Sequence, residues 1–405
     1  MPHTLRFSTM QSTEPEMALL HEVLADFESK SALKVELIVL DWPTAWAEML
    51  KYATYGGGPD VSLVGTTWVS PLCGMQALRP FEPAECRRNG GSDAHLASIW
   101  NAGVVGQKIW ALPWQLDTRV LFYWKSMLRR AGIDEATAFS DLEQLEHTVA
   151  ALAARGETAI VGPTVVSTNT LHNVASWVWS SGGDLMSPQA DRVLFDQPES
   201  LKAIERYYAL HRSLASSGLC EQSRVGMRAE EADQAFLDQR AAITVSGPWI
   251  VSIAALVGEA VLNDLGVAPF PGVPYNGGGS LIIWQRSLQD LEAVALIHYL
   301  TGPDVQRRLS SARGQLPARL DVLAEMGATG DRYAQVLSQN ALRGQALSNH
   351  SLWGLVEERL TRTLGGMWRD VLDPALPELR SAVHGPLTRL AAQLNTTLNR
   401  STGTQ

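Results

Sequence analysis

Tryptophan is the residue type whose abundance in this sequence points most directly to chemistry. The chain has 13 Trp, against 8 Phe and 8 Tyr. A protein core is usually built from Phe before Trp, because a buried indole N–H needs a hydrogen-bond partner. The surplus therefore indicates a surface or cleft that uses large, flat, amphipathic side chains. A carbohydrate site is one such place, because a sugar ring presents a patch of C–H groups that packs flat on an indole.

Five tryptophans are candidates for such a site: Trp68, Trp114, Trp177, Trp179 and Trp249. For each of them the alternative is packing in the core. Trp177 and Trp179 lie two positions apart in a predicted helix, so they cannot both face one cleft. Trp249 follows the Gly247-Pro248 turn, which favours a place in the site for this residue.

Strand and helix signals alternate over the first 65 residues, and this order sets where a ligand would bind. Strands are predicted at 5–8, 35–40 and 61–64, and helices at 14–30 and 43–55. Such an order predicts a parallel, doubly wound sheet whose ligands sit beyond the carboxyl ends of the strands. The segments after the three strands supply the candidates Gln11, Ser12, Asp41, Trp42, Thr66, Thr67 and Trp68. Asp41 is equally suited to cap the helix that follows it.

A glycine-rich run precedes a strand predicted at 281–284. Gly278 and Gly279 in this run either bring backbone N–H groups close to a ligand or permit a turn.

Composition excludes several other classes of protein. The formal net charge of −9, with no basic stripe, argues against nucleic-acid binding. The three cysteines fit no zinc motif, and we expect neither a metal nor a cofactor. Cys73 and Cys86 either pair in an oxidising compartment or, with Cys220, are free thiols. No apolar run approaches the length of a membrane helix, and the first residues lack the features of a secretory signal.

Several short motifs, in order along the chain, resemble the family 1 extracellular solute-binding proteins, which include maltose- and trehalose-type receptors. The family has a run of small residues before Pro-Asp-Val, a Gly-Leu-Pro strand, a Leu-x-Tyr-Asn-Lys strand and an Ala-Gly-Ile turn. This chain matches them at residues 56–61, 106–114, 121–125 and 131–133, with Trp124 in place of the Asn. Further matches lie at 179–183, 241–249, 269–272, 277–279 and 314–319. Each motif alone is weak, and their shared order over nearly the whole chain carries the resemblance.

The resemblance implies two α/β lobes, each a mainly parallel sheet flanked by helices, joined by a hinge that closes on a ligand. The first lobe is expected to hold residues 1–117 and 270–320. The second is expected to hold residues 118–269 and 321–405. Trp68 and Trp114 then belong to the first lobe, and Trp177, Trp179 and Trp249 to the second.

The resemblance also implies further site residues and partners. Asp117 falls at a crossover where the family often places an acidic ligand residue, and Asn349, His350 and Trp353 occupy a stretch that supplies contacts from the second lobe. The implied protein is a monomeric, periplasmic or extracellular receptor of a carbohydrate ABC importer, with or without a membrane tether. It would capture a mono- or oligosaccharide or a glycoside and deliver it to permease subunits, without catalysis, cofactor or nucleic acid.

Two other classes remain as alternatives. A carbohydrate-active hydrolase would stack its sugar on tryptophan rings and would need a pair of carboxylates about 5 to 9 Å apart. Asp41 and Asp117 could supply that pair. The regular units of a β/α barrel and the nucleophile motif of a serine hydrolase are missing. A non-catalytic interaction protein is the second alternative, if the cleft is filled.

Overall fold

The first sheet is built on the alternating segments at the start of the chain. The structure, a computed structural model, describes residues 4–216, 226–312, 314–373, 375 and 378–402. The N-terminal elements are β1 (Thr4–Met10), α1 (Glu14–Ser31), β2 (Lys34–Leu40), α2 (Trp42–Tyr55) and β3 (Val61–Gly65). Strand β1 pairs in parallel with β2 on one side and β3 on the other. The carboxyl ends of these strands therefore meet at one edge of the sheet, as predicted.

Later segments of the chain complete this sheet. Strands β7 (Leu112–Thr118), β12 (Asn276–Trp284) and β13 (Leu316–Pro317) give the order β13-β7-β12-β3-β1-β2, with β4 (Leu78–Arg79) beside β12. Strand β12 is antiparallel to both β3 and β7. Helices α1, α13 (Asp290–Leu300) and α14 (Pro303–Leu309) pack on this lobe, whose core includes Phe7, Leu63, Leu281 and Ile297.

Short elements connect β3 to β7. They are η1 (Thr66–Trp68), α3 (Val69–Gly74), α4 (Pro83–Arg87), η2 (Gly91–Ala94), α5 (Ala97–Ala102), β5 (Val104–Val105) and β6 (Lys108–Ile109).

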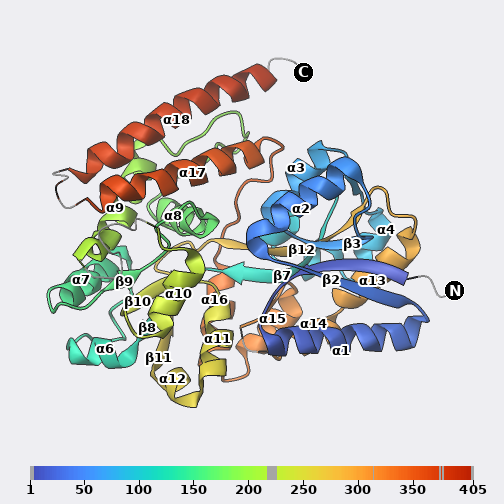
Figure 1. The fold of residues 1–405 in the computed structure, drawn as a ribbon, viewed down its shortest axis with the longest axis horizontal. Coiled ribbons are helices and arrows are strands. Elements are labelled where there is room, and N and C mark those ends of the chain that lie inside the picture. The colour runs from blue at the N-terminus through green and yellow to red at the C-terminus, as the bar shows by residue number, and fades with distance from the viewer. Residues whose placement is uncertain (1–3, 217–225, 313, 374, 376–377, 403–405) are drawn as a thin grey trace.

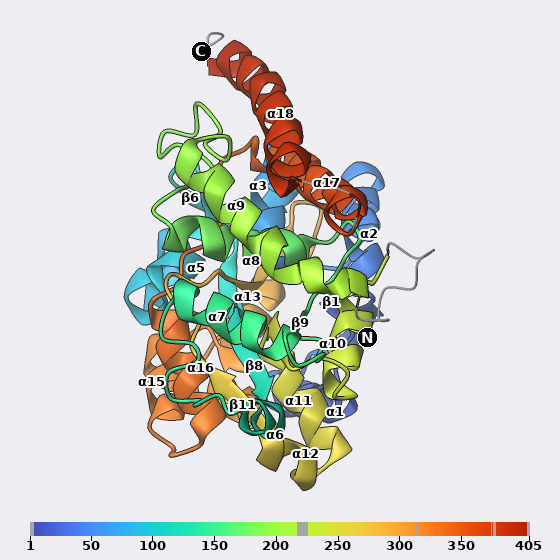
Figure 2. The same ribbon diagram turned by 90° about the vertical axis from the view of Figure 1, so that its left-hand side faces the viewer.

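The second sheet has the order β11-β8-β10-β9. Its strands are β8 (Val120–Trp124), β9 (Ile160–Val161), β10 (Ile243–Ser246) and β11 (Leu265–Ala268). The helices around it are α6 (Lys125–Arg130), α7 (Leu142–Ala153), α8 (Thr168–Ser180), α9 (Pro198–His211), η3 (Arg212–Ser216), α10 (Ala229–Leu237), α11 (Trp249–Val257) and α12 (Glu259–Asp264). Helix α15 (Leu320–Gly327) contacts α14 and β13 of the first lobe and also α16 (Arg332–Leu342). The last two helices are α17 (Trp353–Val371) and α18 (Leu379–Thr402). Figure 2 looks onto α7, α8 and α9, with α17 and α18 at the top of this lobe.

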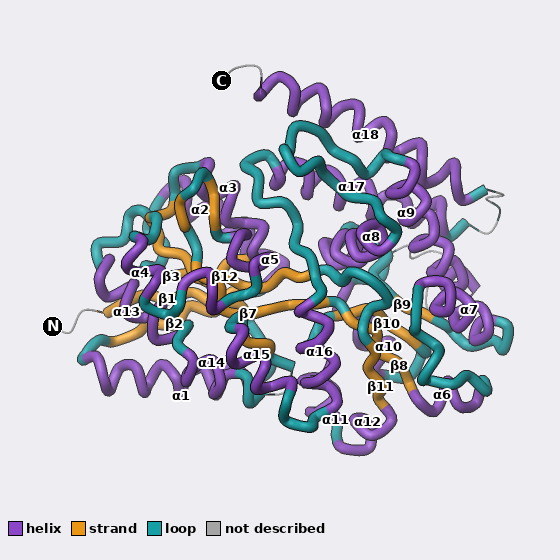
Figure 3. Tube along the Cα trace, turned by 180° about the vertical axis from the view of Figure 1, so that it is seen from behind, coloured by secondary structure: helices purple, strands orange, loops and turns teal. Residues whose placement is uncertain are grey.

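The two sheets form two lobes, and Figure 3 shows β7 running between their strands. The predicted two-lobed α/β fold is thereby confirmed. The chain crosses between the lobes where β7 ends at Thr118 and β8 begins at Val120, and again between β11 and β12. The exact division of residues between the lobes stays a prediction.

Asn340 on α16 ties the crossings together. Its Nδ2 donates to the Thr118 hydroxyl at 2.8 Å and to the Arg119 carbonyl at 2.9 Å. Its Oδ1 accepts the backbone N–H of Phe270, in the second crossing, at 2.8 Å. A single fully buried amide therefore joins three segments that are distant in sequence.

The C-terminal helix, α18, continues to Thr402. Among the residues that the structure describes, every helix is too short or too polar to cross a bilayer.

Candidate functional site

Three indole rings cluster at the carboxyl ends of β2 and β3. Trp68 lies in η1, directly after β3, and its ring centroid is 5.7 Å from that of Trp42 and 5.4 Å from that of Trp46. Trp42 begins α2, directly after β2, and is 47% exposed. The sequence pointed to Trp42 and Trp68 and missed Trp46, which follows Trp42 by one helical turn. This indole cluster offers flat apolar surface on the first lobe.

A buried ion pair lies where the first crossing leaves β7. Arg119 is 2% exposed, and its Nη2 is 3.1 Å from Oδ2 of Asp117. The same Nη2 donates to Asn169 Oδ1 at 3.1 Å and to His172 Nδ1 at 2.8 Å. The other donors of this guanidinium, Nε and Nη1, and the Oδ1 acceptor of Asp117 have no hydrogen-bond partner among the described residues. Buried polar atoms without partners are costly, so the cluster has unused capacity to bind a polar ligand.

The Arg119 guanidinium also lies over two aromatic rings. Its Cζ lies 4.8 Å from the ring centroid of Trp249 and 5.6 Å from that of Tyr275. The Tyr275 ring stacks in turn on His172, with centroids 3.9 Å apart and planes 7° from parallel. These cation–π contacts stabilise the charge of Arg119 beside the ion pair.

His172 is held as a neutral donor. Because a guanidinium can only donate, Nδ1 of His172 must accept, and the ring proton therefore sits on Nε2. Burial, and then the charge of Arg119, lower the pKa of His172 well below its usual range. His172 is half-buried. It presents a fixed N–H donor next to the ion pair.

Trp249 is anchored through its indole nitrogen. Its Nε1 donates to Asp233 Oδ2 at 2.7 Å, and the Ser246 hydroxyl donates to Oδ1 of the same carboxyl at 2.9 Å. Burial raises the pKa of Asp233 to about 6, against these two hydrogen bonds, which lower it. The half-buried ring of Trp249 is therefore fixed at the N-terminus of α11.

Two carboxyl groups join the lobes directly. Thr67 of η1 donates its hydroxyl to Glu357 of α17 at 3.1 Å. Ser252 of α11 donates to Glu16 of α1 at 2.7 Å, and Ser12 donates to the other oxygen of that carboxyl. Burial raises the pKa of Glu357 to about 7. The lobes are thus in contact on both sides of the crossing strands.

Tyr275 connects these groups into one neighbourhood. Burial raises the pKa of Tyr275, and the nearby carboxyls of Asp117 and Glu357 raise it further. The charge of Arg119 and a side-chain hydrogen bond with Thr66 act in the opposite direction. We refer below to the interlobe cluster, whose members are Thr66, Thr67, Asp117, Arg119, His172, Trp249, Tyr275 and Glu357.

Four of the tryptophans expected at the ligand site lie in the hydrophobic cores of the lobes in this structure and face no cleft. They are Trp114, Trp177, Trp179 and Trp353, and each is at most 8% exposed. Trp114 packs on Phe7 in the first lobe, and Trp177 packs on Tyr207 and Phe270 in the second. The prediction for these residues is corrected to core packing, because apolar neighbours surround the rings.

The position of α8 explains the correction for Trp177 and Trp179. Its side toward the crossings carries His172 and Ser176, one turn apart, which contact Arg119 and Tyr275. Residues 177 and 179 lie on other sides of the helix, and Trp179 instead donates its indole N–H to Asp184 at 3.0 Å.

Gly278 and Gly279 lie inside a strand and make no turn, and their role in ligand binding stays a prediction. Both lie inside β12, paired with β7 and β3. Gly278 has φ +135°, and an added Cβ would lie 2.1 Å from the Gln115 carbonyl oxygen. At Gly279 it would lie 2.3 Å from Leu63 Cδ1. The close backbone approach is therefore between strands.

The remaining residues predicted to bind the ligand make local contacts outside the interlobe cluster. Gln11 is exposed, and its side chain donates to the Ser12 carbonyl at 2.9 Å. Asp41 is the N-cap residue of α2 but makes no side-chain capping bond. Asn349 donates to the carbonyls of Asn101 and Val104, both at 2.6 Å, and so joins the segment before α17 to the first lobe. Nδ1 of the half-buried His350 accepts the backbone N–H of Leu352 at 3.3 Å. A role in ligand binding stays a prediction for these residues.

The carboxylate pair of a hydrolase is not assembled. Asp41 follows β2 and Asp117 ends β7, and β12, β3 and β1 lie between these two strands. At about 4.8 Å per strand, the separation across the sheet is about 19 Å, well beyond the span of a glycosidase pair. Within the described parts of the chain, no group of three or more His, Cys, Asp or Glu residues is placed to hold a metal ion.

The disulfide alternative is also decided by the structure. Cys73 and Cys86 are free thiols, and burial raises their pKa values to about 12 and about 11. Cys220 lies outside the described residues.

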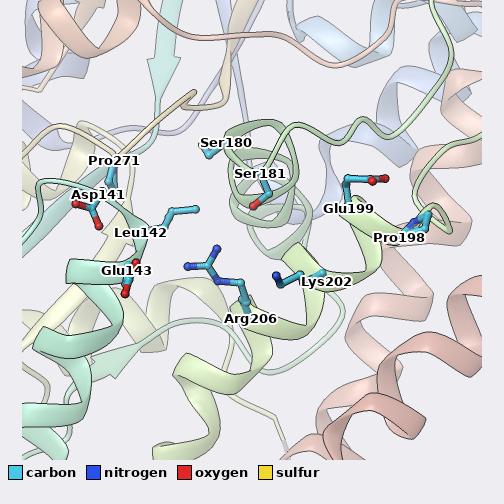
Figure 4. A pocket seen from close by; sticks show the side chains of 10 residues that line it. All are labelled: Asp141, Leu142, Glu143, Ser180, Ser181, Pro198, Glu199, Lys202, Arg206 and Pro271. Atoms are coloured by element: carbon cyan, nitrogen blue, oxygen red, sulfur yellow. The ribbon is translucent and has the colours of Figure 1, made fainter.

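One cavity, of about 630 Å³, lies elsewhere in the second lobe (Figure 4). It is bounded by the start of α7, the end of α8, the start of α9 and Pro271. A second cavity, of about 310 Å³, lies beside the 56–60 loop of the first lobe. Neither is lined by the interlobe cluster, which carries the unpartnered polar atoms of Arg119 and Asp117. We therefore place the candidate site between the lobes.

Known proteins resemble this chain in sequence and in fold. A probable ABC transporter-binding protein of Deinococcus radiodurans is 23% identical to this chain over 262 residues. The matched part is 62% of this chain and 60% of that relative, so this chain spans less than two thirds of the length of the relative. The solved structure of a Thermotoga lettingae ABC transporter solute-binding protein, bound with α-D-tagatose, has a TM-score of 0.82 at 20% identity, covering 98% of this chain and 100% of that one. The GacH receptor of Streptomyces glaucescens, solved unliganded and with acarbose, has a TM-score of 0.78 at 19% identity, covering 97% and 99%.

The family assignment rests on a match over most of the chain. The sequence model of one family of binding proteins matches residues 22–336. At these identities the solved structures establish the fold, in agreement with the two lobes described above. The chain belongs to the bacterial extracellular solute-binding proteins.

Proposed function

We propose that this chain is the binding component of a carbohydrate ABC importer, which captures a sugar between its lobes and delivers it to permease subunits. The observation that carries the proposal is the interlobe cluster, in which unpartnered donors of Arg119 and an acceptor of Asp117 lie against the Trp249 ring. Sugar hydroxyls both donate and accept, and sugar rings stack on indoles, so this combination suits a polyhydroxylated ligand.

The two lobes contribute different parts of the site. The indole cluster of Trp42, Trp46 and Trp68 provides apolar surface from the first lobe. The second provides the Trp249 ring and the Nε2–H donor of His172. The ligand enters between them and gains its second set of contacts when the lobes close. It favours the closed form only by its differential affinity for that form.

Sugar is the favoured ligand class for a second, independent reason. Relatives that share the fold were solved with tagatose and with acarbose. The proposed receptor acts as a monomer outside the cytoplasmic membrane, free or tethered, and catalyses no reaction.

A thermal-shift screen over a sugar library, followed by small-angle scattering with and without the hit, tests the proposal. We expect a rise in melting temperature with no product released, and a change in the radius of gyration on binding. Trp42→Ala should weaken binding with little loss of stability, because the ring is half exposed. Tyr55→Ala, on an 80% exposed ring at the other end of α2, is the matched control. A screen in which no sugar binds would overturn the proposal.

A further inference from the structure

The cavity of Figure 4 is separate from the interlobe cluster and has polar groups of its own. Its volume of about 630 Å³ lies within the range of small-molecule sites. It is bounded by the first turn of α7, the end of α8, the first half of α9 and Pro271 of the second crossing. None of its lining residues belongs to the interlobe cluster, so the proposed sugar site does not account for it.

Hydrogen bonds and packing fix the walls of this cavity relative to one another. Nε of Arg206 on α9 donates to Glu146 on α7 at 2.5 Å. Helix α8 packs against α9, and Ser180 at the end of α8 accepts the backbone N–H of Val273, in the second crossing, at 2.8 Å. The side chains that line the cavity are therefore carried by elements held in place, as a binding site requires.

One wall of the cavity carries hydrogen-bond donors with free capacity. Lys202 and Arg206 lie one turn apart on α9, and Figure 4 shows their charged ends below the Ser181 hydroxyl. Lys202 forms no ion pair with a described residue, and Glu146 uses only Nε of Arg206. The Oγ of Ser181 is buried without a partner among the described residues. Glu199 also lines the cavity, but Figure 4 shows its carboxylate pointing away from both cations. An ammonium, a guanidinium and a hydroxyl together suit a carboxylate.

The opposite wall carries acids. Asp141 and Glu143 lie at the start of α7, on the other side of the cavity from α9 (Figure 4). Hydrogen bonds from the backbone N–H of Gln144 and from the Ser140 hydroxyl lower the pKa of Asp141, so this carboxyl is ionised. Glu143 is exposed and forms no ion pair with a described residue. Leu142 extends between the acidic and the basic groups and adds apolar surface. Two carboxylates together suit an ammonium group.

We infer that this cavity is a second ligand site, separate from the proposed sugar site, and that it takes a small zwitterion with a carboxylate and an ammonium at opposite ends of a short apolar chain. The carboxylate of the ligand faces the donors of α9 and α8, its ammonium faces the two acids of α7, and its chain lies on Leu142. A ligand with a single charge is attracted by one wall and repelled by the other, so both charges are needed.

The test compares zwitterions with their two halves. Calorimetric titration at constant ionic strength uses γ-aminobutyrate beside butyrate and butylamine, and ε-aminohexanoate beside hexanoate and hexylamine. The two chain lengths sample two separations of the charges. For the length that fits the cavity, we expect the zwitterion to bind at least about tenfold more tightly than either half, because each half lacks one set of charge-assisted hydrogen bonds.

Two variants assign the two ends of the ligand to the two walls. Lys202→Met keeps the apolar stem of the side chain, and it should weaken the zwitterion several-fold without weakening the amine. Glu143→Gln should weaken the zwitterion several-fold without weakening the acid. Glu259→Gln is the matched control, because Glu259 is an exposed acid in the first turn of α12, outside the cavity. The control should bind the zwitterion like the wild type, and circular dichroism checks that all three variants are folded.

The results that would overturn the inference are specific to this cavity. They are the absence of binding of either zwitterion at millimolar concentration, and halves that bind as tightly as the whole. Binding that both cavity variants leave unchanged, or that Glu259→Gln weakens as much as they do, would place the zwitterion elsewhere. Each of these results leaves the proposed sugar site intact, since the cavity and the interlobe cluster share no residue.

Discussion

The substitution Glu357→Gln should remove a pH dependence of stability that the structure predicts for this protein. The carboxyl is buried at the contact between the lobes, and its described partner is the Thr67 hydroxyl at 3.1 Å. Burial raises its pKa from the ordinary 4.5 to about 7. Glutamine has nearly the same shape and carries no charge at any pH, so the variant isolates the cost of ionising this group.

The sign and the size of the effect follow from proton linkage. Because the folded state holds this proton more tightly than the unfolded state, the stabilisation is fully present below about pH 4.5 and is lost as the pH rises through about 7. Each tenfold difference in proton affinity corresponds to about 1.4 kcal/mol. The free energy of unfolding should therefore fall by about 2 to 3 kcal/mol between pH 5 and pH 8 because of Glu357 alone.

Urea denaturation of the wild type and the variant across this pH range measures the difference directly. The two curves should lie closest at pH 5 and diverge as the pH rises, with Glu357→Gln the more stable protein at pH 8. Glu358→Gln should follow the wild type, since its side chain is exposed. Wild-type and Glu357→Gln curves that stay parallel would show that water reaches the carboxyl, and would refute the reasoning.

Three further substitutions, one of them with a matched glycine control, test the packing around the site by urea denaturation. Asn340→Ala should lower the free energy of unfolding by about 3 kcal/mol or more, because it removes three buried hydrogen bonds and leaves the Phe270 N–H without a partner. A loss below about 1 kcal/mol would contradict the role of this residue in joining the crossings. Trp249→Phe keeps a ring over Arg119 but leaves Asp233 without its indole donor, so we expect a loss of about 2 kcal/mol; no loss would mean that this bond is not formed. Gly278→Ala should cost more than about 2 kcal/mol, because φ is +135° and the Cβ would meet the Gln115 carbonyl. Gly366→Ala, inside α17 with open space around it, should instead gain up to about 1 kcal/mol, and equal effects of the two glycine substitutions would refute this distinction.

The fold was accessible from the sequence because its signals are local. Apolar periodicity predicts β1, α1, β2, α2 and β3 within a few residues, and the same alternation predicts parallel pairing. Residues that directly follow two of these strands, such as Thr67, Trp68 and Trp42, could be chosen for the same reason. The carboxyl ends of parallel strands share one edge of the sheet, so nothing beyond the strand order is needed.

The rest of the interlobe cluster depends on contacts between distant segments. Arg119 becomes part of it only because α8, α11 and the second crossing converge on its guanidinium. A partial signal for α8 exists in the sequence: Asn169, His172 and Ser176 recur at helical spacing among apolar residues. Glu357 carries no such signal, since a Glu on an amphipathic helix is normally exposed.

The tryptophan surplus led to a partly wrong expectation for a reason that can be quantified. The indole N–H groups of Trp114, Trp177 and Trp368 are buried without a hydrogen-bond partner among the described residues. A missing hydrogen bond costs about 1 to 3 kcal/mol. Burying the 150 to 250 Å² of an aromatic side chain returns about 4 to 6 kcal/mol. The gain from burying the apolar surface exceeds the cost of the missing hydrogen bond, so an indole in a core is stabilising even when its N–H has no partner.

In the receptor proposed above, the balance between open and closed forms would depend on the chemistry of the contacts between the lobes. Two of these contacts are hydroxyl-to-carboxyl hydrogen bonds, from Thr67 to Glu357 and from Ser252 to Glu16. On opening, water replaces each partner, so a bond of this type contributes only about 1 kcal/mol net to closure. The crossings, by contrast, are held by the buried amide of Asn340, which no opening of the lobes needs to break. A fixed hinge combined with weak, exchangeable contacts leaves the closed form only slightly favoured by the protein itself, and the affinity of the ligand for that form then decides the equilibrium.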